Sequence, residues 1–212
     1  MAAVVVDPGK VREFVDGPAF AEWLAGHHDV ADEVWIKIHK VGSERASITP
    51  KEAIDVALCW GWIDAIRKRF DDESYLQRYT PRRKGSVWSQ INVANVTRLI
   101  EAGRMTPHGM REVQAAQADG RWAKAYGSGA NMPIPDDLQA AIDADPVARR
   151  MLEQLSAQNR FALAFRMHSL KTAAGREKRI AAFVDMLRRG ETPHPQKPAR
   201  AARGPASGVD PA

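Results

Sequence analysis

The chain has 212 residues, of which 44% are apolar, and a formal net charge of +5. This length fits one ordinary domain with small appendages, and the single cysteine excludes an intrachain disulfide. No apolar run approaches the roughly 20 residues that cross a bilayer. The first residues also lack the charged and apolar regions of a signal peptide. We therefore expect a cytoplasmic protein without membrane insertion.

The first half of the chain has the pattern of a small antiparallel sheet with helices packed against it. Residues 34–39 alternate at period two, and strand-like runs at 62–70 and 75–80 flank an acidic turn. A helix is expected near 18–25. The series Thr49–Glu52 is typical of a helix start with a capping box and runs into a helix that ends near Gly61.

The second half is predicted to be helical. Cap-then-proline pairs and terminal glycines place helices near residues 89–102, 107–119, 136–144, 146–155, 157–169 and 172–189. The fold class is therefore α+β, with about three strands in the first half. We expect a flexible leader over 1–10, a single domain over 11–190 and a disordered tail over 191–212, where Val209 is the only large apolar residue.

Two segments carry most of the chemistry in this sequence. Residues 57–64 read ALCWGWID, residues 80–92 read TPRRKGSVWSQIN, and together they hold three of the six tryptophans. A carboxylate at Asp64, beside two tryptophans, would be desolvated, which raises its pKa unless a cation compensates. Arg82 or Arg83 is the candidate cation. Asp64 is thus a candidate acid/base, although a structural Asp–Arg pair is the favoured interpretation.

The second segment also predicts a site for an anion. Guanidinium groups suit bidentate recognition of phosphate or carboxylate, and a helix start favours an anion. The candidate ligand-binding residues are Arg82, Arg83, Ser86, Ser89, Asn92, Trp62 and Trp88. In the alternative interpretation Ser89 only caps the helix and the basic residues face solvent.

Three local expectations follow from these segments. Trp62 and Trp88 should be buried. Arg82 and Arg83 are adjacent in an extended segment, so one should turn inward and the other outward. Cys59, between apolar neighbours, should be a buried core thiol and not a nucleophile.

Other patterns in the sequence bear on nucleic-acid, metal and cofactor sites. If Arg67 and Arg69 neighboured Lys37 and His39, a basic sheet face with Trp35 could bind single strands. An edge strand protected by charge is preferred, so nucleic acid is a weakly supported partner. The six histidines lack zinc-site spacing, and the phosphate-binding glycine motifs are absent. We expect no metal and no cofactor.

The two motifs resemble the signature of the YdeI/OmpD-associated family, also called bacteriocin-protection or OmdA-type proteins. The resemblance runs from about Phe14 to Gly190, with later matches at 103–105, 119–122 and 176–180. Trp60 stands where phenylalanine is usual, and Gly175 where threonine is common. The resemblance implies an uncharacterised protein linked to bacteriocin tolerance or envelope stress.

Two functions from different classes follow. The first is a non-catalytic binding protein that holds an anionic small molecule or an acidic protein surface near Arg82, Arg83 and Ser86. The second is an enzyme that uses Asp64, with Arg82 or Arg83 fixing an anionic substrate. The sequence offers no second obvious base, which favours the first.

Overall fold

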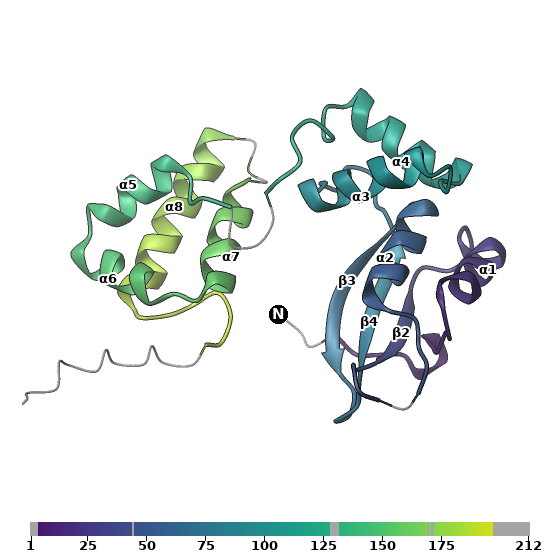
Figure 1. Ribbon diagram of the computed structural model, residues 1–212. Coiled ribbons are helices and arrows are strands. Elements are labelled where there is room, and N and C mark those ends of the chain that lie inside the picture. Colours follow the sequence, from purple (N-terminus) through teal and green to yellow (C-terminus); the bar gives the residue numbers. More distant parts are fainter. Residues whose placement is uncertain (1–3, 44, 128–131, 169, 171, 197–212) are drawn as a thin grey trace, which may run out of the picture. The chain divides into compact units, whose positions relative to one another are not determined.

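The computed structural model describes residues 4–43, 45–127, 132–168, 170 and 172–196 (Figure 1). The chain forms two compact units, residues 1–125 and 126–212. The expected single domain over 11–190 stays a prediction, because compactness does not decide whether two units unfold together. The described residues include no helix long and apolar enough to span a membrane.

The first unit is built on a four-stranded sheet in the order β1-β2-β4-β3. Its strands are β1 (Val11–Arg12), β2 (Val34–His39), β3 (Trp62–Arg69) and β4 (Ser74–Pro81). The pairs β2–β4 and β3–β4 are antiparallel, and the two-residue β1 pairs parallel with β2. The three predicted strands are confirmed, and the short β1 adds a fourth. A 3-10 turn over Pro8–Lys10 precedes β1.

Four helices complete this unit, and their starts follow the predicted capping chemistry. They are α1 (Gly17–His27), α2 (Pro50–Cys59), α3 (Gln90–Glu101) and α4 (Pro107–Ala118). Thr49 and Glu52 form the expected capping box of α2. The helices α1 and α2 pack on one face of the sheet (Figure 1), where Phe20, Leu24 and Val56 join Ile36 and Trp62 in an apolar core.

The hairpin of β3 and β4 presents different residues to its two faces. Asp64 lies opposite Tyr79, and Ile63 lies opposite Thr80. Because neighbouring residues of a strand point to opposite faces, Asp64 and Tyr79 face the helices with Trp62. We call this side the helical face. Ile63, Ala65, Arg78 and Thr80 lie on the other side, which we call the opposite face.

A β-bulge interrupts the pairing of β3 between Asp64 and Arg67. Residues three apart in a regular strand point to opposite faces, but the extra residue of a bulge restores the same side. Arg67 lies opposite Gln77, and Gln77 is two residues from Tyr79, so both point to the same face. The bulge therefore puts Asp64 and Arg67 together on the helical face.

The sheet order also shows whether Arg67 and Arg69 can form a basic face with Lys37 and His39. β4 lies between β2 and β3, and Lys37 and Lys68 both pair with Leu76. Lys37 thus shares its face with Lys68 and not with Arg67. Trp35 is fully buried, and Lys37 and His39 approach Glu13 at 3.0 and 3.5 Å. The arrangement required for that face is absent, while β3 is the expected charged edge strand.

The second unit is a helical assembly with its own core. It contains α5 (Asp136–Asp143), α6 (Pro146–Gln154), α7 (Ala157–His168) and α8 (Ala173–Arg188). The core includes Leu138, Ile142, Leu152, Leu163, Met167, Phe183 and Leu187. These helices confirm the helical second half, and the whole chain is mixed α+β as predicted.

The segment after α8 begins with an anchored stretch. The side chain of Asn159 donates to the carbonyl of His194 at 3.0 Å and accepts from its backbone N–H at 2.8 Å. The Gln196 side chain accepts from the Ser156 backbone N–H at 3.0 Å. Residues 197–212, most of the tail expected to be disordered, lie outside the described residues, as do residues 1–3 of the leader.

Candidate anion-binding site

The connection from β4 to α3 is a tight loop that fixes the predicted site residues. The Arg82 backbone N–H donates to the carbonyl of Gly61 at 3.0 Å, and that of Ser86 donates to Arg83 at 2.9 Å. Ser89 then caps α3, because its hydroxyl accepts from the Asn92 backbone N–H at 3.1 Å. The loop is therefore tied at both ends.

Arg82 is the inward residue of the Arg82–Arg83 pair. Its side chain is only 7% exposed, and its guanidinium carbon lies 3.6 Å from the centre of the Trp88 ring. It also donates to the carbonyl of Val87 at 3.4 Å. A cation over an indole face is attracted by the ring quadrupole, more strongly where water is excluded. Arg82 thus clamps the loop onto Trp88.

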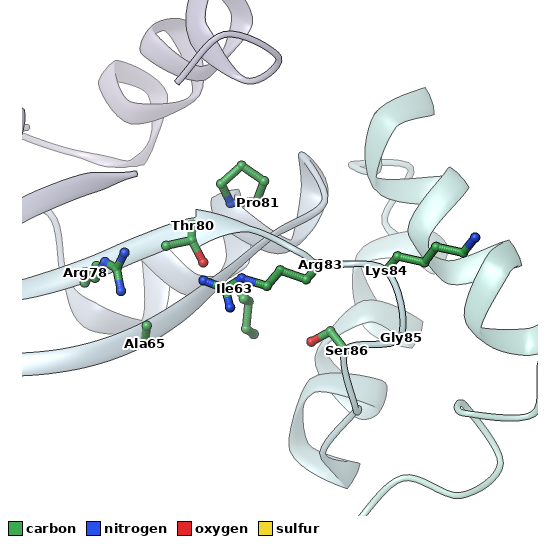
Figure 2. A pocket seen from close by; sticks show the side chains of 9 residues that line it. All are labelled: Ile63, Ala65, Arg78, Thr80, Pro81, Arg83, Lys84, Gly85 and Ser86. Atoms are coloured by element: carbon green, nitrogen blue, oxygen red, sulfur yellow. The ribbon is translucent and has the colours of Figure 1, made fainter. Parts of the chain in front are cut away.

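Arg83 is exposed and lines a recess of about 410 Å³ on the opposite face of the hairpin (Figure 2). We call it the basic recess. Its lining consists of the opposite-face residues of the hairpin together with the loop: Ile63, Ala65, Arg78, Thr80, Pro81, Arg83, Lys84, Gly85 and Ser86. Arg83 runs back along the hairpin toward Arg78, whereas Lys84 points the other way (Figure 2). The prediction that one arginine turns inward and the other outward is confirmed.

The two arginines of the basic recess differ in how they are compensated. Arg78 forms an ion pair with Glu33 at 2.5 Å and lies over the Trp35 ring. The side chain of Arg83 makes no hydrogen bond or ion pair with any described residue. Of these two arginines, Arg78 is balanced and held in place, and Arg83 has donors that are available.

Asp64 lies in a second recess of about 360 Å³ on the helical face. We call it the amide recess, because the amide side chains of Gln77, Asn92 and Asn95 line it. The other lining residues are Asp64, Arg67, Pro50, Lys51, Ile54, Tyr79 and Ile91. Asp64 is solvent-accessible, yet crowding by protein raises the pKa of its carboxyl, and the charges of Arg82 and Arg67 oppose that shift.

The remaining predicted residues are structural in this unit. Trp62 and Trp88 are 1% and 2% exposed, as expected. The Trp62 ring N–H donates to the carbonyl of His28 at 3.2 Å, and Trp88 packs against Trp122. Cys59 is buried, which raises the pKa of its thiol and agrees with a core residue.

The structure thus divides the predicted set between two faces. Arg83 and Ser86 meet in the basic recess, and Asp64 and Asn92 meet in the amide recess. Sequence reasoning missed Arg78, Arg67 and Asn95 as lining residues. Alternation along 75–80 could have placed Arg78 beside Thr80, but the bulge hides the position of Arg67. No group of three His, Cys, Asp or Glu side chains that could hold a metal occurs among the described residues.

Comparisons with known families divide the chain in the same way. Residues 12–112 match the family described as "Domain of unknown function (DUF8412)". No curated protein and no solved structure matches the chain. Both recesses and the two motifs at 57–64 and 80–92 lie within the first match. Residues 131–190, in the second unit, match the family described as "Bacteriocin-protection, YdeI or OmpD-Associated", which confirms the resemblance over that part of the chain.

Proposed function

We propose that the protein is a non-catalytic binding protein whose first unit holds an anionic group in the basic recess. The observation that carries this proposal is the exposed Arg83, directed toward Arg78 within one recess that also contains Ser86. A guanidinium offers paired donors that match a carboxylate or a phosphate. The hydroxyl of Ser86 supplies a further donor at the loop side.

Charge balance supports an anion of low charge. Glu33 compensates Arg78, so the recess itself presents the charge of Arg83, with Lys84 at its rim. Ile63, Ala65 and Thr80 give the recess a partly apolar floor. A carboxylate or phosphate group on a small molecule, or on an acidic protein surface, meets these conditions.

The test is titration of the full chain with inorganic phosphate and with acetate, followed by nuclear magnetic resonance at low ionic strength. Saturable shifts at Arg83 and Ser86 are expected. Arg83→Gln should weaken binding about tenfold, since hydrogen bonds to charged groups contribute roughly 1.5–3 kcal/mol. Arg104→Gln is the matched control: it removes the same charge at an exposed position that lines neither recess. Equal effects of both variants would show only general electrostatic attraction.

The enzyme alternative has less support. Arg83 lies on the opposite face of the hairpin from Asp64, and Arg82 is stacked on Trp88. Neither is placed to present a substrate to Asp64.

The link to bacteriocin tolerance or envelope stress rests on the family name matched by residues 131–190. We propose that anion binding by the first unit serves that process. A strain that lacks the protein should become more sensitive to bacteriocin, and the Arg83→Gln variant should restore tolerance less well than Arg104→Gln. Equal restoration of tolerance by the two variants would show that the basic recess has no part in this process.

A further inference from the structure

The amide recess contains an acidic and a basic side chain that interact only at a distance. Asp64 and Arg67 line the same recess, yet they form no ion pair with each other. Asp64 has no side-chain hydrogen bond or ion pair with any other described residue. Opposite charges that serve only the fold normally pair directly, because an unpaired charge near protein atoms loses hydration without compensation.

Arg67 is held in a fixed orientation by its neighbours. Its Nε donates to the side-chain oxygen of Gln77 at 3.1 Å, and its guanidinium stacks over Tyr75 at 4.4 Å. Gln77 is 4% exposed, and its amide group in turn donates to the carbonyl of Ala65 at 3.3 Å, within the bulge. The two terminal nitrogens of Arg67 have no partner among the described residues. This arrangement leaves the bidentate end of the guanidinium free for a carboxylate.

The opposite wall supplies amide groups. Asn92 and Asn95 lie on the first turns of α3 and line the recess, and neither side chain makes a hydrogen bond within the described part of the chain. Ile54 and the half-exposed Ile91 add an apolar surface between the polar groups. A partly apolar recess on which a small number of polar groups converge is typical of a binding site for a small molecule.

We propose that the amide recess binds a small zwitterion, a molecule that carries both a carboxylate and an ammonium group, such as an amino acid or a short peptide. Arg67 receives the carboxylate, Asp64 receives the ammonium group, and Asn92 and Asn95 bond the amide or backbone polar atoms between them. The bulge in β3 makes the site, because it brings the two charges to one face. This proposal does not rest on the basic recess, which lies on the other face.

The test uses three matched ligands on the full chain: glycylglycine, N-acetylglycylglycine, which lacks the ammonium group, and glycylglycinamide, which lacks the carboxylate. Binding is followed by nuclear magnetic resonance through the side-chain amides of Asn92 and Asn95. Glycylglycine should give saturable shifts there, and each modified ligand should bind about tenfold more weakly. This comparison needs no variant and therefore does not depend on any substitution folding correctly.

Variants then assign each charge to its partner. Asp64→Asn should weaken glycylglycine about tenfold and leave N-acetylglycylglycine unchanged, whereas Arg67→Gln should leave glycylglycinamide unchanged. Arg83→Gln is the control on the other face and should not alter glycylglycine binding. Equal binding of the three ligands, or no saturable shift at Asn92 and Asn95, would overturn the proposal. None of these outcomes would affect the proposal that Arg83 binds phosphate.

Discussion

Arg82 and Arg83 are adjacent residues of the same type, yet their side chains lie in different surroundings. Arg82 is nearly buried on Trp88, and Arg83 extends over an exposed recess. The contribution of each to stability should differ accordingly, because the strength of a cation–π contact depends on how far water is excluded.

We expect Arg82→Ala to lower the free energy of unfolding by about 2 kcal/mol or more, the value of a desolvated cation–π contact. Arg83→Ala should change it by no more than about 0.5 kcal/mol, as is usual for exposed positions. Urea unfolding followed by tryptophan fluorescence measures both. Similar losses for the two variants would contradict the assignment of Arg82 as the clamp.

The raised pKa of Asp64 leads to a prediction of how the stability of the fold depends on pH. Desolvation by the surrounding protein raises the folded-state pKa of Asp64 above the ordinary value of 3.8, and nearby arginines only partly oppose this shift. The folded state therefore binds the proton more tightly than the unfolded state, and stability falls as pH rises between the two pKa values. Asp64→Asn should melt at a higher temperature than the unmodified protein at neutral pH, and this advantage should vanish below the unfolded value of 3.8.

Thermal unfolding across a pH series measures this effect. Asp72→Asn, at a side chain that is 88% exposed, is the matched control and should show no comparable gain. A lower melting temperature for Asp64→Asn at neutral pH would mean that the carboxylate supports the fold.

At the scale of elements, the sequence predicted the helices and the three longer strands closely, because capping and periodicity are local properties. Thr49, Ser89 and Thr106 cap the helices that their positions indicate. It could not predict which residues line each recess. That depends on the strand order and on the bulge, and both are set by tertiary packing.

The approach of α4 to the end of α2 gives a prediction about one glycine. A Cβ at Gly109 would lie 2.3 Å from the carbonyl oxygen of Cys59, which also accepts from the Thr106 hydroxyl at 2.6 Å. Gly109→Ala must therefore push α4 away, and we expect a loss of about 1–3 kcal/mol, as for overpacked cores. Urea unfolding measures the loss.

Gly26→Ala is the matched control in α1, where an added Cβ meets nothing within 4 Å. It should be neutral or stabilise by up to about 1 kcal/mol, because alanine loses less backbone entropy than glycine. A harmless Gly109→Ala would show that the contact between α4 and α2 is loose.

For the whole molecule, the described apolar clusters separate into those of the first unit and that of the second. All six tryptophans lie between residues 23 and 122, in the first unit. Tryptophan fluorescence therefore reports on the first unit alone, whereas far-ultraviolet circular dichroism reports on helices of both. The two signals together can show whether the units unfold as one.

Phe183→Ala tests this. Phe183 is 3% exposed in the core of the second unit, and such a truncation typically costs about 3–5 kcal/mol. We expect part of the dichroism transition to move to lower temperature while the fluorescence transition stays in place. A parallel shift of both signals would show a single cooperative domain across 11–190.

The bulge in β3 has a consequence for how this sequence can vary. Substitutions on one face of the hairpin alter one recess and leave the other intact, so each surface can change independently. A change of length between Asp64 and Arg67 acts differently: deletion of one residue there would remove the bulge, and both charges would stay on the helical face, because residues two apart in a regular strand share a face. Homologous chains that keep both charges on one face should therefore have either two residues between them and a bulge, or one residue between them and a regular strand.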